Sequence, residues 1–202
     1  MKRICLLLLA VISSSMLFAQ EEEPAEKKFF KKENLFTGGT VNASFFNGTT
    51  ALGISPYFGY SINRFVDVAV SANLNYISQR DYDQYGDKLR QTIYGPGAFI
   101  RLYPVKFLFA HAQYEYNLIR YRYIPPSSQG LPDEKFRFNA PSFLVGGGFA
   151  NGREGTGSFY YISILWDVLK DNNSPYVDNL NRPLPQIRAG YNIALFQGKD
   201  RD

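Results

Sequence analysis

Hydrophobic and polar residues alternate along most of this chain, with a period of two. The clearest stretch runs from Val66 to Tyr76, where every second side chain is apolar and those between are mostly small and polar. Such alternation predicts β-strands with one face buried and one face in a polar environment. We expect eight strands, at about residues 36–46, 50–62, 66–76, 91–103, 107–123, 138–150, 157–169 and 186–196.

The connectors between these stretches follow a pattern of lengths. The first, second, fourth and sixth are short, whereas the third (about 79–90), the fifth (about 124–137) and the seventh are long and polar. A chain that crosses a membrane eight times has tight turns on the side of its termini, here the near side, and longer loops on the opposite, far side. The pattern predicts an all-β fold, an eight-stranded antiparallel up-and-down transmembrane β-barrel with three long outer loops.

The residue types decide which face meets lipid. The polar face carries mostly Ser, Asn, Gly, Gln and Thr, which fit a narrow lumen, and the middles of the strands hold no lysine. On the apolar face, aromatic residues stand near strand ends, including Phe58, Tyr76, Tyr94 and Trp166. Aromatic rings with a polar tip settle at the headgroup level of a membrane. The alternative is a soluble exported barrel that holds a lipid in an apolar lumen.

The two ends of the chain differ from the barrel. Residues 1–19 have the form of a secretory signal peptide, with Lys2 and Arg3 before the apolar run 6–12, which is too short to span a membrane. Residues 20–35 are a charged stretch typical of a flexible periplasmic linker. We therefore expect the barrel at 36–196 and a short tail at 197–202.

Composition narrows the function. The net charge of +4 comes from scattered basic residues, so nucleic acid is not an expected partner. The sole cysteine, Cys5, lies inside the signal peptide, which leaves the mature chain without a thiol nucleophile or thiolate metal site. The Asn and Asp residues near 171–179 match no calcium loop and are typical of turns. We expect no cofactor and no metal.

Charged residues fall in the phase of the strands that should face the lumen. They are Asp67, Arg101, His111, Glu115, Asp167 and Arg188. Charges inside a narrow barrel must pair, so we expect a network of salt bridges that plugs the lumen. The alternative is a narrow porin-like channel in which these charges select ions.

Four prolines, Pro56, Pro96, Pro141 and Pro185, recur at intervals of 40 to 45 residues in the strands that return from the far side. Because proline cannot donate to a sheet ladder, we expect them at strand starts or bulges.

Two further sets of residues are candidates for chemistry or binding. His111 is the only histidine, and Ser71, Ser163 and Glu115 show no spacing that would build a catalytic triad with it, so we do not expect an enzyme. Tyr and Arg are favoured at binding surfaces. Those expected in far-side loops or at the barrel rim are Tyr82, Tyr85, Arg120, Tyr121, Arg122, Tyr123 and Tyr176.

The chain resembles the small eight-stranded outer-membrane barrels of the outer membrane protein A and X type, without a periplasmic domain. The matching segments are the signal end 18–20, the opening 38–42, the run 54–56, the strand from Tyr160 to Leu169, and the closing run 189–191. The resemblance implies architecture and not activity. It also implies an aromatic C-terminal signal for the barrel-assembly machinery; here Phe196 is followed by six further residues.

From these patterns we expect an exported outer-membrane barrel of structural or surface-interaction type. Its expected partners are outer-membrane lipid and lipopolysaccharide, the barrel-assembly machinery, and an unidentified extracellular or periplasmic protein.

Overall fold

The computed structural model describes residues 30–46, 48–153, 157–178 and 180–196. The expected signal peptide, most of the expected linker and the tail 197–202 lie outside these residues. Eight strands form the barrel: β1 (Leu35–Phe46), β2 (Thr49–Asn63), β3 (Val66–Arg80), β4 (Lys88–Val105), β5 (Leu108–Ile124), β6 (Glu134–Asn151), β7 (Phe159–Asp167) and β8 (Gln186–Ala194). In the described part of the chain, two short 3-10 helices accompany them, η2 (Lys32–Asn34) and η3 (Ser127–Gln129). No helix in the described part of the chain has the length and hydrophobicity needed to cross a membrane.

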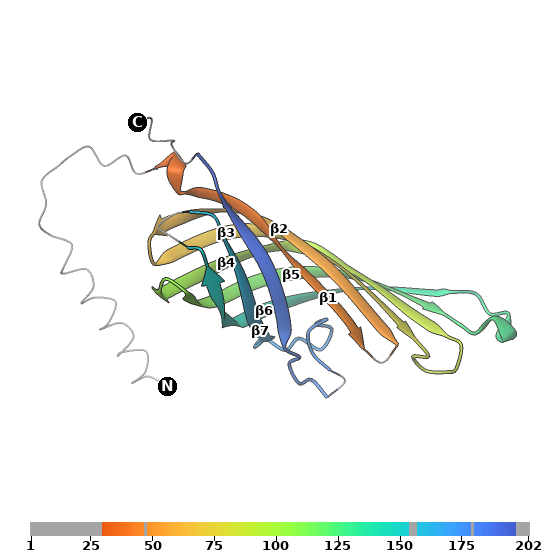
Figure 1. Ribbon diagram of the computed structural model, residues 1–202. Helices are drawn as coiled ribbons and strands as arrows, with labels where there is room; N and C mark the ends of the chain where they lie inside the picture. The colour runs from red at the N-terminus through yellow and green to blue at the C-terminus, as the bar shows by residue number, and fades with distance from the viewer. Residues whose placement is uncertain (1–29, 47, 154–156, 179, 197–202) are drawn as a thin grey trace, which may run out of the picture. The chain divides into compact units, whose positions relative to one another are not determined.

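Each strand pairs antiparallel with its neighbours in sequence, and β1 pairs with β8, so the barrel is closed in up-and-down order (Figure 1). This confirms the predicted fold. The observed strands β3, β4 and β6 run further to the far side than predicted, to Arg80, from Lys88 and from Glu134. The reason is that their backbone ladders continue beyond the apolar zone, where the alternation of side chains no longer marks a strand.

The barrel wall has unequal height. Strands β4, β5 and β6 contain 18, 17 and 18 residues, whereas β7 and β8 contain nine each. The β5–β6 hairpin therefore extends beyond the rest of the wall at the far side (Figure 1). Pairing of β6 with β7 ends at Leu144 opposite Asp167, so residues 134–142 of β6 have a strand partner on one side only. The connector between β7 and β8 (residues 168–185, of which 179 is not described) occupies the far-side mouth beside this seam.

The outer and inner faces carry opposite chemistry. Large apolar side chains such as Ile54, Val70, Ile162 and Ile187 are more than half exposed on the outer wall. The inner face instead buries acids, bases and amides, including Arg101 and Glu115 with no exposed surface. An apolar exterior around a polar interior is the arrangement of a barrel that spans a membrane, and it rules out the soluble lipid-holding alternative.

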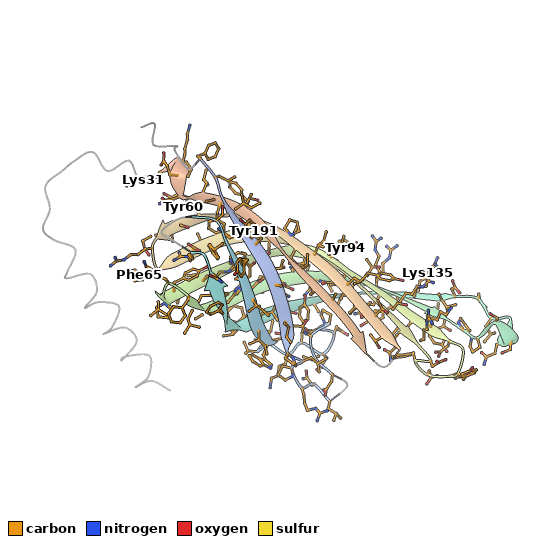
Figure 2. The ribbon with its side chains drawn as sticks, in the orientation of Figure 1. Lys31, Tyr60, Phe65, Tyr94, Lys135 and Tyr191 are labelled. Atoms are coloured by element: carbon orange, nitrogen blue, oxygen red, sulfur yellow. The ribbon has the colours of Figure 1, made fainter. Side chains whose placement is uncertain are left out.

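The outer face also shows where the membrane ends. Tyr60 and Phe65 lie toward the near-side end, Tyr94 lies further along the wall, and Lys135 lies on the far-side extension (Figure 2). The aromatic residues mark the two edges of the apolar belt, and the extension beyond Tyr94 stands outside it.

The expectation for the prolines was wrong for three of the four. Pro56, Pro96 and Pro141 lie within strands, without a change of register at any of them. The ladders on one side of Pro56 (with β3) and of Pro96 (with β5) are interrupted for two residues, and Pro141 lies on the seam-facing edge of β6. A nitrogen without hydrogen is tolerated where no acceptor needs it, so the interruption or free edge takes the place of a bulge.

Candidate functional site: the lumen and the far-side mouth

The near-side part of the lumen is filled by aromatic rings around one cation. Arg101 is fully buried, and its Cζ lies 4.0 Å from the ring centroid of Tyr161 and 4.4 Å from that of Phe99. Guanidinium groups over ring faces are favourable when removed from water. Space for these rings comes from small residues opposite: a methyl group added at Gly190 would lie 2.5 Å from Cζ of Tyr161. The result is a packed layer across the barrel.

A second cation closes the near-side end. Arg153, in the connector between β6 and β7, lies 3.6 Å (Cζ) from the ring centroid of Tyr103 and donates from Nη1 to the backbone oxygen of Arg64 at 2.9 Å. Its Nη2 lies 3.4 Å from Oδ1 of Asp67, and both side chains are buried. Asp67 is therefore paired across the barrel with a residue that the sequence analysis had not singled out.

The middle of the lumen holds a continuous chain of hydrogen bonds. Arg101 Nε donates to His111 Nδ1 at 3.3 Å, so the ring proton is on Nε2, which donates to Gln113 Oε1 at 3.1 Å. Gln113 Nε2 in turn donates to Glu115 Oε1 at 2.9 Å. Both ring nitrogens of His111 are thus used by partners other than serine.

The chain ends on a buried carboxylate with three donors. Glu115 Oε1 also accepts from Nη1 of Arg188 at 3.0 Å, and its Oε2 accepts from the hydroxyl of Tyr176 at 2.6 Å. Glu115 has no exposed surface. A buried carboxylate requires this degree of hydrogen bonding to remain in the interior.

The connector between β7 and β8 is pinned to the same region. The hydroxyl of Ser174 donates to Asp167 Oδ2 at 2.6 Å and lies 3.0 Å from the hydroxyl of Ser142. Asp167 Oδ1 accepts from the backbone nitrogen of Phe143 at 3.0 Å. Together with Tyr176, these contacts hold the connector down on the lumen from the far side.

All six charged residues predicted to face the lumen lie inside it and are buried. Four of them, Arg101, His111, Glu115 and Arg188, belong to one hydrogen-bonded chain, while Asp67 and Asp167 have separate partners. The expectation that Tyr176 offers an outward loop or rim contact was wrong. Its backbone belongs to a far-side connector, but the side chain turns inward because Glu115 offers its hydroxyl an acceptor.

The other predicted rim residues divide between two faces of the extension. Tyr85 projects into solvent, 94% exposed, at the tip of the β3–β4 loop. Tyr121 and Tyr123 are in the inward phase, whereas Arg120 and Arg122 are in the outward phase of β5. Tyr82 lines the same mouth as Tyr121.

Basic residues form a band on the outward face of the extension. This basic band consists of Arg80, Lys88, Arg90, Arg120, Arg122, Lys135 and Arg137. The register places Arg90 opposite Arg122, Arg122 opposite Lys135, and Arg120 opposite Arg137. Within the part of the chain that the structure describes, Arg122 is the one member with an ion pair, to Asp133. Like charges directly opposite one another on a sheet are destabilising.

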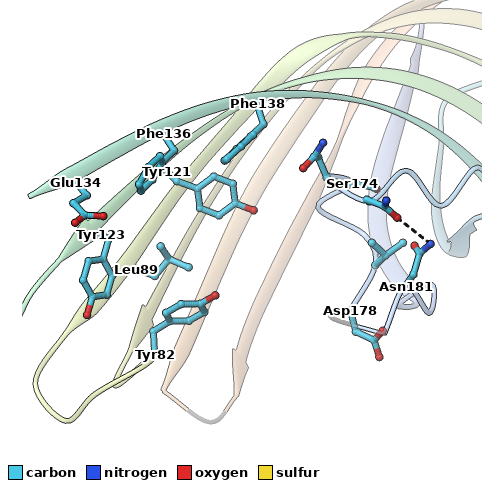
Figure 3. Close-up of a pocket in the computed structure, with 13 residues that line it drawn as sticks. Tyr82, Leu89, Tyr121, Tyr123, Glu134, Phe136, Phe138, Ser174, Asp178 and Asn181 are labelled. Atoms are coloured by element: carbon cyan, nitrogen blue, oxygen red, sulfur yellow. Dashed lines mark hydrogen bonds between the residues drawn. The ribbon is translucent and has the colours of Figure 1, made fainter.

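The inward face of the extension borders an outer cavity of about 510 Å³. One wall is mostly aromatic and comes from the β3–β4 loop and strands β4 to β6: Tyr82, Leu89, Tyr121, Tyr123, Phe136 and Phe138. The opposite wall is polar and comes from the β7–β8 connector: Asn172, Asn173, Ser174, Asp178 and Asn181. The close-up shows these two walls facing each other across the mouth (Figure 3).

The β3–β4 loop is held by one buried carboxylate. Asp87 accepts from the backbone nitrogens of Tyr82, Asp83 and Gln84 at 2.6, 3.0 and 2.9 Å, and from the hydroxyl of Tyr123 at 3.0 Å. Burial opposes its ionisation, but these donors outweigh burial and hold the pKa of Asp87 below its ordinary value. The loop, and with it the ring of Tyr82, is thereby fixed beside the cavity.

The chain was compared with known protein families, curated proteins and solved structures. No protein-family model matches the chain, and no curated protein matches it. Among solved structures, Ail, the attachment invasion locus protein of Yersinia pestis, in complex with the heparin analogue sucrose octasulfate, is similar with 10% sequence identity and a TM-score of 0.47. That match covers 79% of this chain and 96% of Ail.

The N-terminal β-barrel domain of OprF from Pseudomonas aeruginosa is similar with 14% identity and a TM-score of 0.39, covering 79% of this chain and 95% of the domain. Both likenesses concern overall form alone. On its own strand order and inverted wall chemistry, the chain has the fold of the small eight-stranded outer-membrane barrels that its sequence resembles.

Proposed function

We propose that this protein is an integral outer-membrane barrel of surface-interaction type, which acts at its far-side surface while its lumen is closed to solutes. The observation that carries the proposal is the hydrogen-bonded chain from Arg101 to Arg188, which occupies the lumen with buried charges. Export by the expected signal peptide 1–19 and insertion by the barrel-assembly machinery are part of this proposal.

The filling of the lumen favours a plug over a pore. Eight strands enclose just enough space for side chains. Here that space holds a ring layer around Arg101, a polar layer around Glu115, and Tyr176 and Ser174 from above. An ion on this path would have to separate buried charges that are bonded to one another.

The basic band is the part of the far-side surface for which we propose a first partner, lipopolysaccharide. It stands just beyond the aromatic edge marked by Tyr94, whose ring lies 5.0 Å from Cζ of Arg120. Phosphate groups of lipopolysaccharide would lie at this height in an outer leaflet. Arginine pairs with phosphate in bidentate geometry, and the opposed like charges of the band would then be neutralised. We propose that the band binds these phosphates and seats the barrel in the membrane.

Binding of lipopolysaccharide by the basic band is tested by thermal unfolding in two kinds of vesicle. The wild-type protein is refolded in phosphatidylcholine, with and without added lipopolysaccharide, and compared with Arg90→Gln/Arg120→Gln/Arg137→Gln. We expect lipopolysaccharide to raise the unfolding temperature of the wild type, in a salt-sensitive manner, and not that of the triple variant. The near-side variant Arg64→Gln/Lys106→Gln should respond like the wild type. An equal response from all three proteins would refute the role of the band.

A further inference from the structure

The outer cavity joins an aromatic wall to a wall of amide side chains. Its aromatic wall leaves large apolar surface uncovered: Tyr82 is 50% exposed and Phe136 is 49% exposed. Tyr82 is held through its backbone nitrogen by Asp87 at 2.6 Å. Elsewhere in the wall, Tyr121 packs edge-on against Phe138 with centroids 5.5 Å apart and accepts a hydrogen bond from Gln91 at 2.8 Å. A ligand with flat apolar faces can therefore stack here without ordering the wall.

The facing wall supplies hydrogen-bonding groups in a fixed frame. The connector is folded on itself by a β-bridge between Val177 and Pro183. Asn181 donates to Asn172 at 3.3 Å, and this bond leaves the amide nitrogen of Asn172 and the amide oxygen of Asn181 with capacity for a further partner. The amide of Asn173, with one donor and one acceptor group, lines the cavity beside them. Such groups suit ligands whose hydroxyls both donate and accept.

The charge of the cavity excludes anions. Among the described residues that line it there is no Lys or Arg, and Glu134 and Asp178 are acidic. The charge of Asp178 is already satisfied within the connector, because the backbone nitrogen and the guanidinium of Arg182 both donate to it and lower its pKa. The basic band lies on the other face of the same strands, so the extension presents basic residues outward and a face without basic residues inward.

From this combination we infer that the outer cavity binds a neutral saccharide, with pyranose faces stacked on Tyr82 and Phe136 and hydroxyls bonded to the asparagines of the connector. The volume of about 510 Å³ is within the range of small-ligand sites, and suits a short oligosaccharide. The inference rests on the proposed surface-interaction function and names the ligand class of its far-side mouth.

The test is saturation-transfer NMR on the full chain refolded in a zwitterionic micelle whose detergent carries no sugar. The probes are maltotriose and cellotriose, with sucrose octasulfate as the anionic counter-probe. We expect a neutral trisaccharide to bind, and Tyr82→Ala to weaken it about tenfold, which corresponds to the stacking of one ring. Asn173→Ala should weaken binding from the opposite wall.

The matched control is Tyr85→Ala, which removes a tyrosine from the same loop that is more exposed than Tyr82 and lies outside the cavity. Heat-dependent gel mobility shows that each variant is folded. The inference is overturned if neither trisaccharide binds, if Tyr85→Ala weakens binding as much as Tyr82→Ala does, or if sucrose octasulfate or a cationic peptide displaces the trisaccharide from the cavity. A folded, non-conducting barrel that fails to bind sugar would refute this inference alone, whereas a conducting barrel would refute the proposed function.

Discussion

Replacing Glu115 with Gln removes the negative charge at the centre of the lumen while keeping the size of the side chain. The carboxylate accepts three hydrogen bonds, from Gln113, Arg188 and Tyr176, at 2.9, 3.0 and 2.6 Å. At about 1.5 kcal/mol for each bond to a charged group, the loss is about 4–5 kcal/mol. This agrees with the roughly 3–5 kcal/mol measured when one partner of a buried ion pair is removed. Since Gln retains some of the hydrogen bonds, we expect Glu115→Gln to lower the free energy of unfolding by about 3 kcal/mol.

The assay is urea unfolding in lipid vesicles, followed by the fluorescence of Trp166, the only tryptophan, which lies on the outer wall. The double variant Glu115→Gln/Arg188→Met leaves no uncompensated charge and should be more stable than Glu115→Gln. Lys106→Gln, which removes an exposed charge from a near-side turn, should unfold like the wild type. A change below about 0.5 kcal/mol for Glu115→Gln would show that the charge network does not hold the barrel together.

Three further changes test other parts of the structure. Gly95→Ala would bring a methyl group into the backbone oxygen of Tyr116 and should destabilise the barrel by about 1–3 kcal/mol, whereas Gly39→Ala, at 3.6 Å from the nearest atom, should not; the same urea assay decides. Tyr176→Phe removes the hydroxyl bonded to Glu115, so hydrogen exchange in the β7–β8 connector should speed up while exchange in β1–β5 is unchanged. Because the pKa of Asp87 is lowered in the folded protein, the stability that its carboxylate contributes is complete above the ordinary pKa of 3.8 and is lost as the pH falls through the lower folded value. Proteolysis of the β3–β4 loop should therefore rise only below pH 3.8 in the wild type. In Asp87→Asn it should already be raised at neutral pH.

The alternation of residues along single strands was enough to predict the barrel and the inward charges. Both predictions depend on the alternation of inward and outward side chains, which can be read from the sequence of a single strand such as β3 without knowing which strands pair with it. The partners of those charges could not be predicted in the same way. Asp67 stands opposite Arg101 in the ladder but pairs with Arg153 from a near-side connector, because Arg101 is held by rings and His111.

The far-side features depend on contacts between strands. The residues of the basic band look scattered along the sequence, and only the register of β3 to β6 brings them side by side. The outer cavity exists because β7 and β8 are half the length of β4 to β6, which leaves room for the connector in the mouth. A signal for the inward turn of Tyr176 could have been found in Glu115, because a buried carboxylate needs several donors and Arg188 and Gln113 serve only one of its two oxygens.

The central claim is that the lumen is closed and the function lies on the surface. Planar-bilayer conductance of the refolded protein tests it most directly, with folding shown by heat-dependent gel mobility. If the lumen is closed, the wild-type protein gives a silent bilayer. Discrete, reproducible conductance steps whose ion selectivity changes in Glu115→Gln would contradict it and would place the function inside the barrel.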